Sequence, residues 1–238
     1  MKYEMIIFDA DETLFDFKLS EKEAFKNAML EFDLEYDESH HLKIYQRINT
    51  TIWKEFEEGL ITQDRLKTER FKRLSDSLNV KFDEQEFAKS YIKHLAMASF
   101  LYPDSVTLVE NLHKDYTLTI VTNGLKDVQD HRIRKSVISK YFKDIIISEE
   151  VAVSKPDPKI FELALTSVKH IDKQKVLIVG DSLTSDIQGG INAGIDTCWY
   201  NPGKKVNMTE IKPTYEISSL MELISILEGQ PPFADKPI

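Results

Sequence analysis

The chain has 238 residues, of which 42% are hydrophobic and 30% charged, and its formal net charge is −9 at neutral pH. This length suits one large domain or a core domain with an insert. The acidic balance excludes a basic face for nucleic-acid polymers or for an anionic membrane. The one cysteine, Cys198, excludes an internal disulfide framework. With neither a signal-peptide pattern nor an apolar run of membrane-spanning length, we expect a soluble, cytoplasmic protein.

The first predicted element is a strand at residues 5–8, which runs directly into two carboxylates, Asp9 and Asp11. An unbroken apolar run of this length is typical of a buried strand in a parallel sheet. Residues two apart in an extended chain point the same way, so both carboxylates should lie together beyond the strand, where open α/β sheets bind ligands. A hard divalent cation such as Mg²⁺ would relieve their repulsion. An EF-hand loop is excluded because Leu14 and Ser20 occupy the positions that need Gly and Glu.

Residues 17–98 show helical periodicity and no convincing strand, which predicts an insert of four or five helices after the first strand. Gly59 is placed to end one helix, and Thr62 to cap the next. We therefore expect a helical domain over residues 17–98 and a core domain built from residues 1–16 and 99–238.

Beyond residue 99, predicted strands alternate with predicted helices, which favours an α/β fold with a doubly wound parallel sheet. The Pro-rich residues 230–238 are predicted to form a loose tail. The predicted strands are residues 116–121, 145–148, 176–179, 197–200 and 214–217, and the predicted helices are residues 104–113, 127–138, 160–168, 186–193 and 220–227.

Three further motifs follow predicted strands. Residues 122–124, Thr-Asn-Gly, alone favour a hairpin, but a helical pattern follows them, which indicates an anion cradle at a strand-to-helix turn. Lys155 is biased to an extended conformation by the proline after it, although a lone lysine is more often a solvated one. Asp181, Ser182 and Asp186 follow the fourth buried strand, where in isolation they would be an ordinary helix start.

The charges of these motifs complement one another. Asp9, Asp11, Asp181 and Asp186 would bring four negative charges into one crevice, and unpaired charges there are costly. Mg²⁺ and Lys155 would offset three of them, and a proton on Asp11 the fourth. The sequence therefore predicts a site that accepts an anion within an acidic protein.

In this order the motifs resemble those of the haloacid dehalogenase (HAD) superfamily of phosphatases, and the likeness covers nearly the whole chain. The helical insert resembles the family's cap domain, and the core its Rossmann-like fold. Asp11 separates the phosphatases from the dehalogenase branch, which lacks this second acid. Residues 8–15, 53–59 and 148–151 are moreover similar to the YjjG/YfnB-type pyrimidine 5′-nucleotidases.

The resemblance implies a phosphatase that works through an aspartyl-phosphate, with Asp9 as nucleophile and Asp11 as acid and base. It implies that Thr122, Asn123 and Lys155 hold the phosphoryl oxygens. It implies Mg²⁺, or Mn²⁺ in its place, bound by Asp9, Asp11 and Asp181. Ser182 and Asp186 are then expected next to these ligands without binding the metal directly.

The implied substrates are pyrimidine nucleoside monophosphates. Candidate contacts in the insert are Phe17, Asn49, Trp53 and Arg70, of which the two aromatic residues are more typical of a helical core and the arginine of a surface or bridging charge.

Three alternatives remain open: a sugar-phosphate or phosphoglycolate phosphatase, a phosphomutase, and a non-catalytic phosphate-binding regulator. In each case we expect a small-molecule partner, no nucleic acid and no membrane, and a monomer or homodimer.

Overall fold

The computed structural model describes residues 2–170 and 172–229, and these form two compact units. The inserted unit is Lys18–Ala98, and the sheet unit comprises the described residues on either side of it. The predicted tail at residues 230–238 lies outside the described residues.

The sheet unit is built on a six-stranded, all-parallel sheet in the order β3-β2-β1-β4-β5-β6. This order places β1 between β2 and β4, where the direction of winding reverses, and it confirms the predicted doubly wound α/β fold. The strands are β1 (Met5–Phe8), β2 (Thr117–Thr122), β3 (Asp144–Ile147), β4 (Val176–Gly180), β5 (Asp196–Tyr200) and β6 (Tyr215–Ile217).

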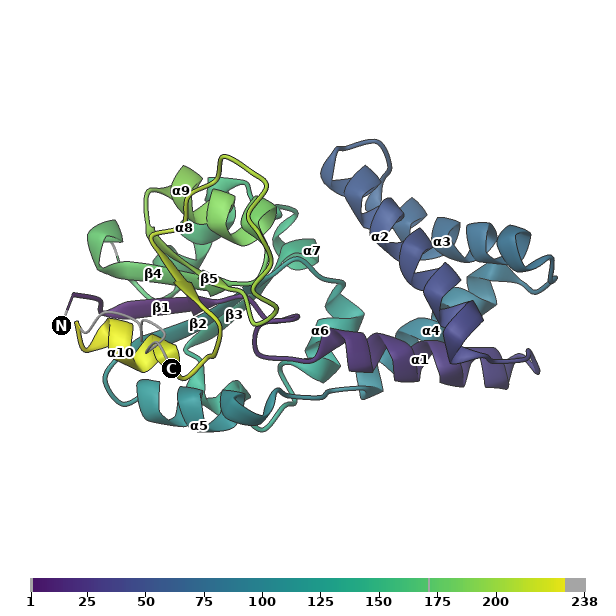
Figure 1. The fold of residues 1–238 in the computed structure, drawn as a ribbon, viewed down its shortest axis with the longest axis horizontal. Coiled ribbons are helices and arrows are strands. Elements are labelled where there is room, and N and C mark those ends of the chain that lie inside the picture. Colours follow the sequence, from purple (N-terminus) through teal and green to yellow (C-terminus); the bar gives the residue numbers. More distant parts are fainter. Residues whose placement is uncertain (1, 171, 230–238) are drawn as a thin grey trace, which may run out of the picture. The chain divides into compact units, whose positions relative to one another are not determined.

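Alternate side chains of the strands enter two separate apolar cores, one on each face of the sheet. Ile6 and Phe8 of β1 face the core that includes Leu108 of α5 and Leu223 of α10, whereas Met5 and Ile7 face the core that includes α8. Figure 1 shows α5 and α10 on one side of the sheet and α8 and α9 on the other. Burial on both faces explains why β1 is an uninterrupted apolar run.

The helices of the sheet unit mostly follow the strands they connect. They are α5 (Pro103–Leu112), α6 (Lys126–Arg132), α7 (Ser148–Val151), α8 (Pro158–Ser167), α9 (Gln188–Ala193) and α10 (Glu222–Leu227), with a π-helical turn at Leu183–Ile187 and 3₁₀ turns at Ser139–Tyr141 and Lys173–Lys175.

The helix predicted over residues 127–138 was wrong at its end, because α6 stops at Arg132. Ile133 and Ile138 are both buried in the core, but residues five apart do not share one helical face. Turns bring both side chains inward, and the Ser136 and Ser139 hydroxyls bond to main-chain carbonyls there, at 2.7 and 2.9 Å.

At two other predicted elements the type of structure changes, whereas the remaining boundaries shift by at most two residues. Ser148, predicted to end a strand, instead begins the short helix α7. The helix predicted at residues 186–193 is divided into the π-helical turn and α9. In both cases polar residues that can bond to the backbone directly follow a buried strand, where local turns compete with regular structure.

The inserted unit is helical, as its periodicity predicts. Its elements are α1 (Phe17–Glu31), whose first residue belongs to the sheet unit, α2 (Lys43–Glu57), α3 (Gln63–Leu78) and α4 (Glu84–Met97), with a π-helical turn at Glu38–Leu42. Gly59 follows α2 with a φ of 71°, and the Thr62 hydroxyl caps α3 by accepting from the Arg65 amide, which confirms both predicted helix signals. Stacked rings of Phe25, Tyr45 and Phe71 fill its interior.

Among the described residues, no helix combines the length and the apolar character that crossing a membrane requires.

Candidate active site

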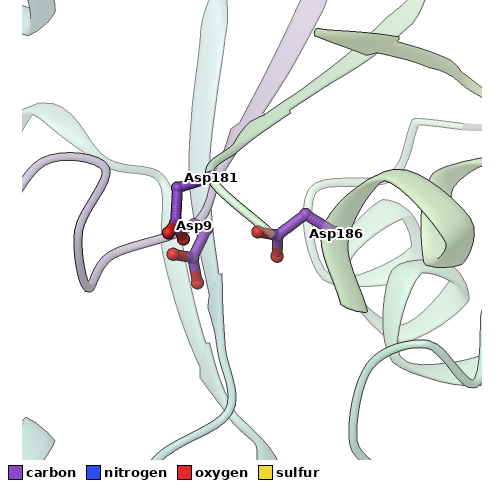
Figure 2. A group of neighbouring side chains, drawn as sticks. All are labelled: Asp9, Asp181 and Asp186. Carbon is purple, nitrogen blue, oxygen red and sulfur yellow. The ribbon is translucent and has the colours of Figure 1, made fainter. Parts of the chain in front are cut away.

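Three carboxylates meet where neighbouring strands of the sheet end. Asp9 follows β1, Asp181 follows β4, and Asp186 belongs to the π-helical turn after β4. One oxygen of each side chain lies within 4.8 Å of an oxygen of the other two. Figure 2 shows these three side chains around the end of β4. The parallel order β2-β1-β4 thus brings together residues more than 170 positions apart in the chain.

The Lys155 ammonium lies among these carboxylates and makes two hydrogen bonds and a further ion pair. It donates to Asp9 Oδ1 at 2.5 Å, pairs with Asp186 Oδ1 at 2.7 Å and donates to the Val121 carbonyl at 2.8 Å. Burial alone would lower the pKa of Lys155, but the carboxylates of Asp186 and Asp9 outweigh it and raise that pKa above its ordinary value. The lysine is therefore a fixed positive charge beside Asp9.

Asn123 holds Lys155 in place through the main chain. Its side-chain oxygen accepts from the Lys155 amide at 2.8 Å, and its Nδ2 donates to the Lys155 carbonyl at 2.9 Å. These paired bonds tie the turn after β2 to the segment that carries the lysine. In this structure the Asn123 side chain thus orients a positive charge.

Asp186 lies directly against the backbone of Gly180. Its Oδ2 accepts from the Ser182 amide at 3.0 Å, and its Oδ1 pairs with Lys155. A Cβ on Gly180 would stand 2.3 Å from the Asp186 carboxyl carbon, a distance that no side chain tolerates. Glycine at this position therefore makes room for the carboxylate.

Two hydroxyls complete the immediate surroundings of Asp9. Thr13 is fully buried, and its Oγ1 donates to Asp9 Oδ2 at 3.3 Å. Thr122 ends β2 with 1% of its surface exposed, and its Oγ1 accepts from Gln129 Nε2 at 3.3 Å. Thr13 thus bonds to Asp9 directly, and Thr122 ends the strand that pairs with β1.

Among the described residues, Asp11 is not a member of the group of three carboxylates, and its side chain is held by two side chains of α6. Arg132 Nη1 lies 2.7 Å from its Oδ1, and Gln129 Nε2 donates to its Oδ2 at 2.8 Å. The charge balance predicted from the sequence omitted this arginine. A Gln-x-x-Arg spacing on the helix after Thr-Asn-Gly was the signal that could have identified both residues, since residues three apart share a helical face.

The carboxylate group suits a hard divalent cation. Burial, together with the neighbouring Asp186 and Glu12, raises the pKa of Asp181 to about 7. Burial likewise raises the pKa of Asp9 above its ordinary value, although Lys155 opposes the shift. Oxygen donors with this excess of negative charge are what Mg²⁺ prefers in proteins. The residues present therefore fit Mg²⁺.

The four predicted substrate contacts differ in their surroundings, and one of them, Phe17, belongs to the sheet unit. Phe17 places its ring against the Arg132 guanidinium, with 5.2 Å from ring centroid to Cζ, and Trp53 packs edge to face with Phe56. Asn49 and Arg70 are buried and bonded to each other at 3.0 Å. Asn49 also donates to Glu21 Oε1 at 2.7 Å, so both polar side chains belong to a network inside the inserted unit.

Comparisons with known proteins identify the family of the chain. Residues 6–200 match the model of the haloacid dehalogenase-like hydrolases. The chain is 35% identical to the pyrimidine 5′-nucleotidase YjjG of Escherichia coli over 95% of this chain and 99% of that one. It is also 35% identical to the pyrimidine 5′-nucleotidase PynA of Streptococcus pneumoniae over 96% of each chain.

Among solved structures, that of the HAD-hydrolase YfnB from Bacillus subtilis bound to magnesium superposes with a TM-score of 0.90, at 36% identity, over 95% of this chain and 99% of that one. The likeness in sequence and in fold extends over nearly the whole chain. The chain belongs to the haloacid dehalogenase-like hydrolase family.

Proposed function

We propose that the chain is a Mg²⁺-dependent phosphatase that cleaves phosphate monoesters through a phosphoryl-enzyme on Asp9, with pyrimidine nucleoside 5′-monophosphates as substrates. The observation that carries the proposal is the environment of Asp9. A buried carboxylate at the point where the sheet reverses its winding is bonded to Lys155 and Thr13, with a second acid, Asp11, two residues later.

In the first step a carboxylate oxygen of Asp9 forms a bond to phosphorus as the bond from phosphorus to the ester oxygen breaks. An ionised carboxylate needs no base to activate it, and the neighbouring Lys155 ammonium favours the ionised form of Asp9 by opposing the rise in its pKa. Asp11 donates its proton to the departing oxygen, so that an alcohol leaves rather than an alkoxide. Such acid–base assistance is typically worth about 10²–10⁴-fold in rate.

In the second step water attacks the phosphorus of the phosphoryl-aspartate. Asp11, now ionised, takes a proton from this water, the bond from Asp9 to phosphorus breaks, and inorganic phosphate forms. Both side chains return to their starting protonation states, so the cycle closes without a further reactant.

Lys155 and the Thr122 hydroxyl are the groups proposed to hold the phosphoryl oxygens, with the main-chain amide of Asn123. A fixed ammonium in a buried site stabilises negative charge on these oxygens at little reorganisation cost. The side chains of Asp9 and Asp181 and the Asp11 carbonyl would hold Mg²⁺, with Ser182 and Asp186 behind them. When bound, the cation neutralises charge on the phosphoryl group.

The proposed substrate class rests on the likeness to YjjG and PynA, both named as pyrimidine 5′-nucleotidases. The inserted unit is the proposed source of base recognition. Phe17 and Trp53 remain proposed contacts for stacking on a base. Asn49 and Arg70 are better assigned to orienting the helices of that unit, because each is buried and bonded within it.

The test measures phosphate release from UMP, dUMP, dTMP, CMP, AMP, GMP, phosphoglycolate and hexose phosphates, with Mg²⁺ and with EDTA. We expect Mg²⁺-dependent release that favours the uracil and thymine nucleotides. Release confined to phosphoglycolate or hexose phosphates would retain the chemistry and reject the nucleotidase. Transfer of phosphate within a sugar phosphate without release would identify a mutase, and turnover near background with every compound would favour a phosphate-binding regulator.

A further inference from the structure

We propose that Arg132 and Gln129 are positioning residues for Asp11, and that the direction they give to its side chain decides how well it reaches the leaving group. This inference rests on the proposed phosphatase function and assigns two residues to it that lie outside the motifs considered above.

Both oxygens of the Asp11 carboxylate are held by donors from α6. Arg132 Nη1 lies 2.7 Å from Oδ1, and Gln129 Nε2 lies 2.8 Å from Oδ2. Arg132 Nη1 also donates to Gln129 Oε1 at 3.2 Å, so the two donors orient each other. A carboxylate bonded at both oxygens cannot rotate freely, and its direction is set by the helix.

The arginine has no alternative position in water, because it is fully buried. Its guanidinium lies over two aromatic rings, 5.7 Å from the centroid of Phe15 and 5.2 Å from that of Phe17. Phe15 in turn bridges back to Asp11 through the main chain. A buried charge without a partner is costly. The buried Arg132 guanidinium is therefore strongly favoured to pair with Asp11.

Gln129 also connects the acid to the proposed phosphate-binding turn. Its Nε2 donates to Thr122 Oγ1 at 3.3 Å as well as to Asp11. The absence of a side chain on Gly124 makes room for Gln129, because a Cβ there would stand 2.5 Å from Gln129 Nε2. One amide group thus fixes the distance between the proton donor and a hydroxyl that is proposed to contact phosphate.

This arrangement predicts a dependence on the leaving group. The 5′-oxygen of UMP departs as an alcohol and needs the proton of Asp11, whereas p-nitrophenolate is a stable anion that departs without one. Misdirecting Asp11 should therefore slow the hydrolysis of UMP much more than that of p-nitrophenyl phosphate.

The experiment compares both substrates in the full-length chain with Mg²⁺, using Arg132→Met, Arg132→Lys and Gln129→Leu. For Gln129→Leu and Arg132→Met we expect kcat with UMP to fall on the order of 10²-fold, against less than about tenfold with p-nitrophenyl phosphate, as is typical of a misplaced catalytic group. Arg132→Lys keeps the charge and should recover part of the loss. Arg134→Met is the matched control, since Arg134 pairs instead with Asp130 and Glu150, and should change neither rate.

A second measurement repeats Gln129→Leu and Arg132→Met in an Asp11→Asn background. If both residues act mainly through Asp11, neither substitution should cost its full factor in kcat again, because groups that act as a unit are not additive. If Arg132→Met does not fold, Gln129→Leu leaves the buried arginine in place and carries the test alone.

Three results would overturn the inference: equal losses with the two substrates, unchanged or faster hydrolysis of UMP, or a full additional loss in the Asp11→Asn background. Failure of the proposed function would show in the unaltered chain, which would then release no phosphate from UMP, whereas failure of the inference alone leaves the unaltered chain active and shows only among the variants.

Discussion

The carboxylate of Asp186 occupies the space in which Gly180 would carry a side chain. A Cβ at Gly180 would stand 2.3 Å from both Cγ and Oδ2 of Asp186. The same carboxylate pairs with Lys155 at 2.7 Å, and Lys155 in turn donates to Asp9 at 2.5 Å. The absence of a side chain on Gly180, the last residue of β4, is therefore linked through two ion pairs to the position of the proposed nucleophile.

Gly180→Ala should accordingly lower activity by moving Asp186 and, with it, Lys155. We expect kcat to fall on the order of 10²-fold, and the free energy of unfolding to fall by about 1–3 kcal/mol from overpacking. Phosphate release and chemical denaturation measure the two effects. Gly203→Ala is the control, because its Cβ would meet nothing nearer than 3.8 Å. Unchanged activity in Gly180→Ala would show that the Asp186–Lys155 pair does not position the nucleophile.

Asp9→Asn should abolish turnover, because an amide oxygen cannot form the phosphoryl-enzyme. We expect a loss of at least about 10⁴-fold in kcat, as for the removal of other catalytic nucleophiles. Mass spectrometry after acid quenching should find phosphate on the unaltered chain during turnover and none on the variant. Asp33→Asn serves as the control, since Asp33 has a φ of 53°, which asparagine also tolerates. Substantial phosphatase activity in Asp9→Asn would assign the nucleophile elsewhere.

Mg²⁺ should stabilise the chain against heat through the carboxylate group. Binding at a hundredfold excess over Kd adds about 2.7 kcal/mol, and each kcal/mol raises Tm by roughly 2–4 °C in a chain of this size. Asp181→Asn should reduce the Mg²⁺-induced shift while leaving Tm in EDTA equal or higher, because one of three crowded carboxylates is removed. An equal shift in both proteins would place the cation at another site.

Asp196 should contribute stability that depends on pH. Burial alone would raise the pKa of Asp196, but hydrogen bonds from Lys2 and Tyr3 hold this pKa below its ordinary value. The Tyr3 hydroxyl lies 2.6 Å from Asp196 Oδ2. A lowered pKa in the folded state stabilises the protein above the unfolded pKa of about 3.9, and this stability is lost as pH falls through the folded value.

Thermal denaturation from pH 7 downward should therefore show Asp196→Asn less stable near neutrality, with the difference shrinking below about pH 4. Glu4→Gln is the control, because Glu4 pairs with Lys175 on the surface and such pairs contribute about 0–1 kcal/mol. A difference between Asp196→Asn and the unaltered chain that stays constant with pH would show that the charge of Asp196 is not what stabilises the fold.

The amino-acid sequence by itself determined the alternation of strands and helices and the helical insert. It also determined that Asp9, Thr122 and Asp181 would each stand at the end of a strand, because a buried parallel strand is an unbroken apolar run whose polar neighbours mark its ends. These are properties of local pattern, and the strand order then brings the three residues to one edge of the sheet.

The tertiary structure alone decided which partners these residues meet. The end of α6 at Arg132 could not be inferred from periodicity, since the core takes both Ile133 and Ile138 through turns. The pairing of Arg132 with Asp11 joins residues 121 positions apart, and no local pattern specifies it. Asn123 likewise bonds to the main chain of Lys155 across 32 positions. Such contacts depend on how α6 and the turn after β2 pack on the sheet, and that packing follows from the whole core rather than from any one segment.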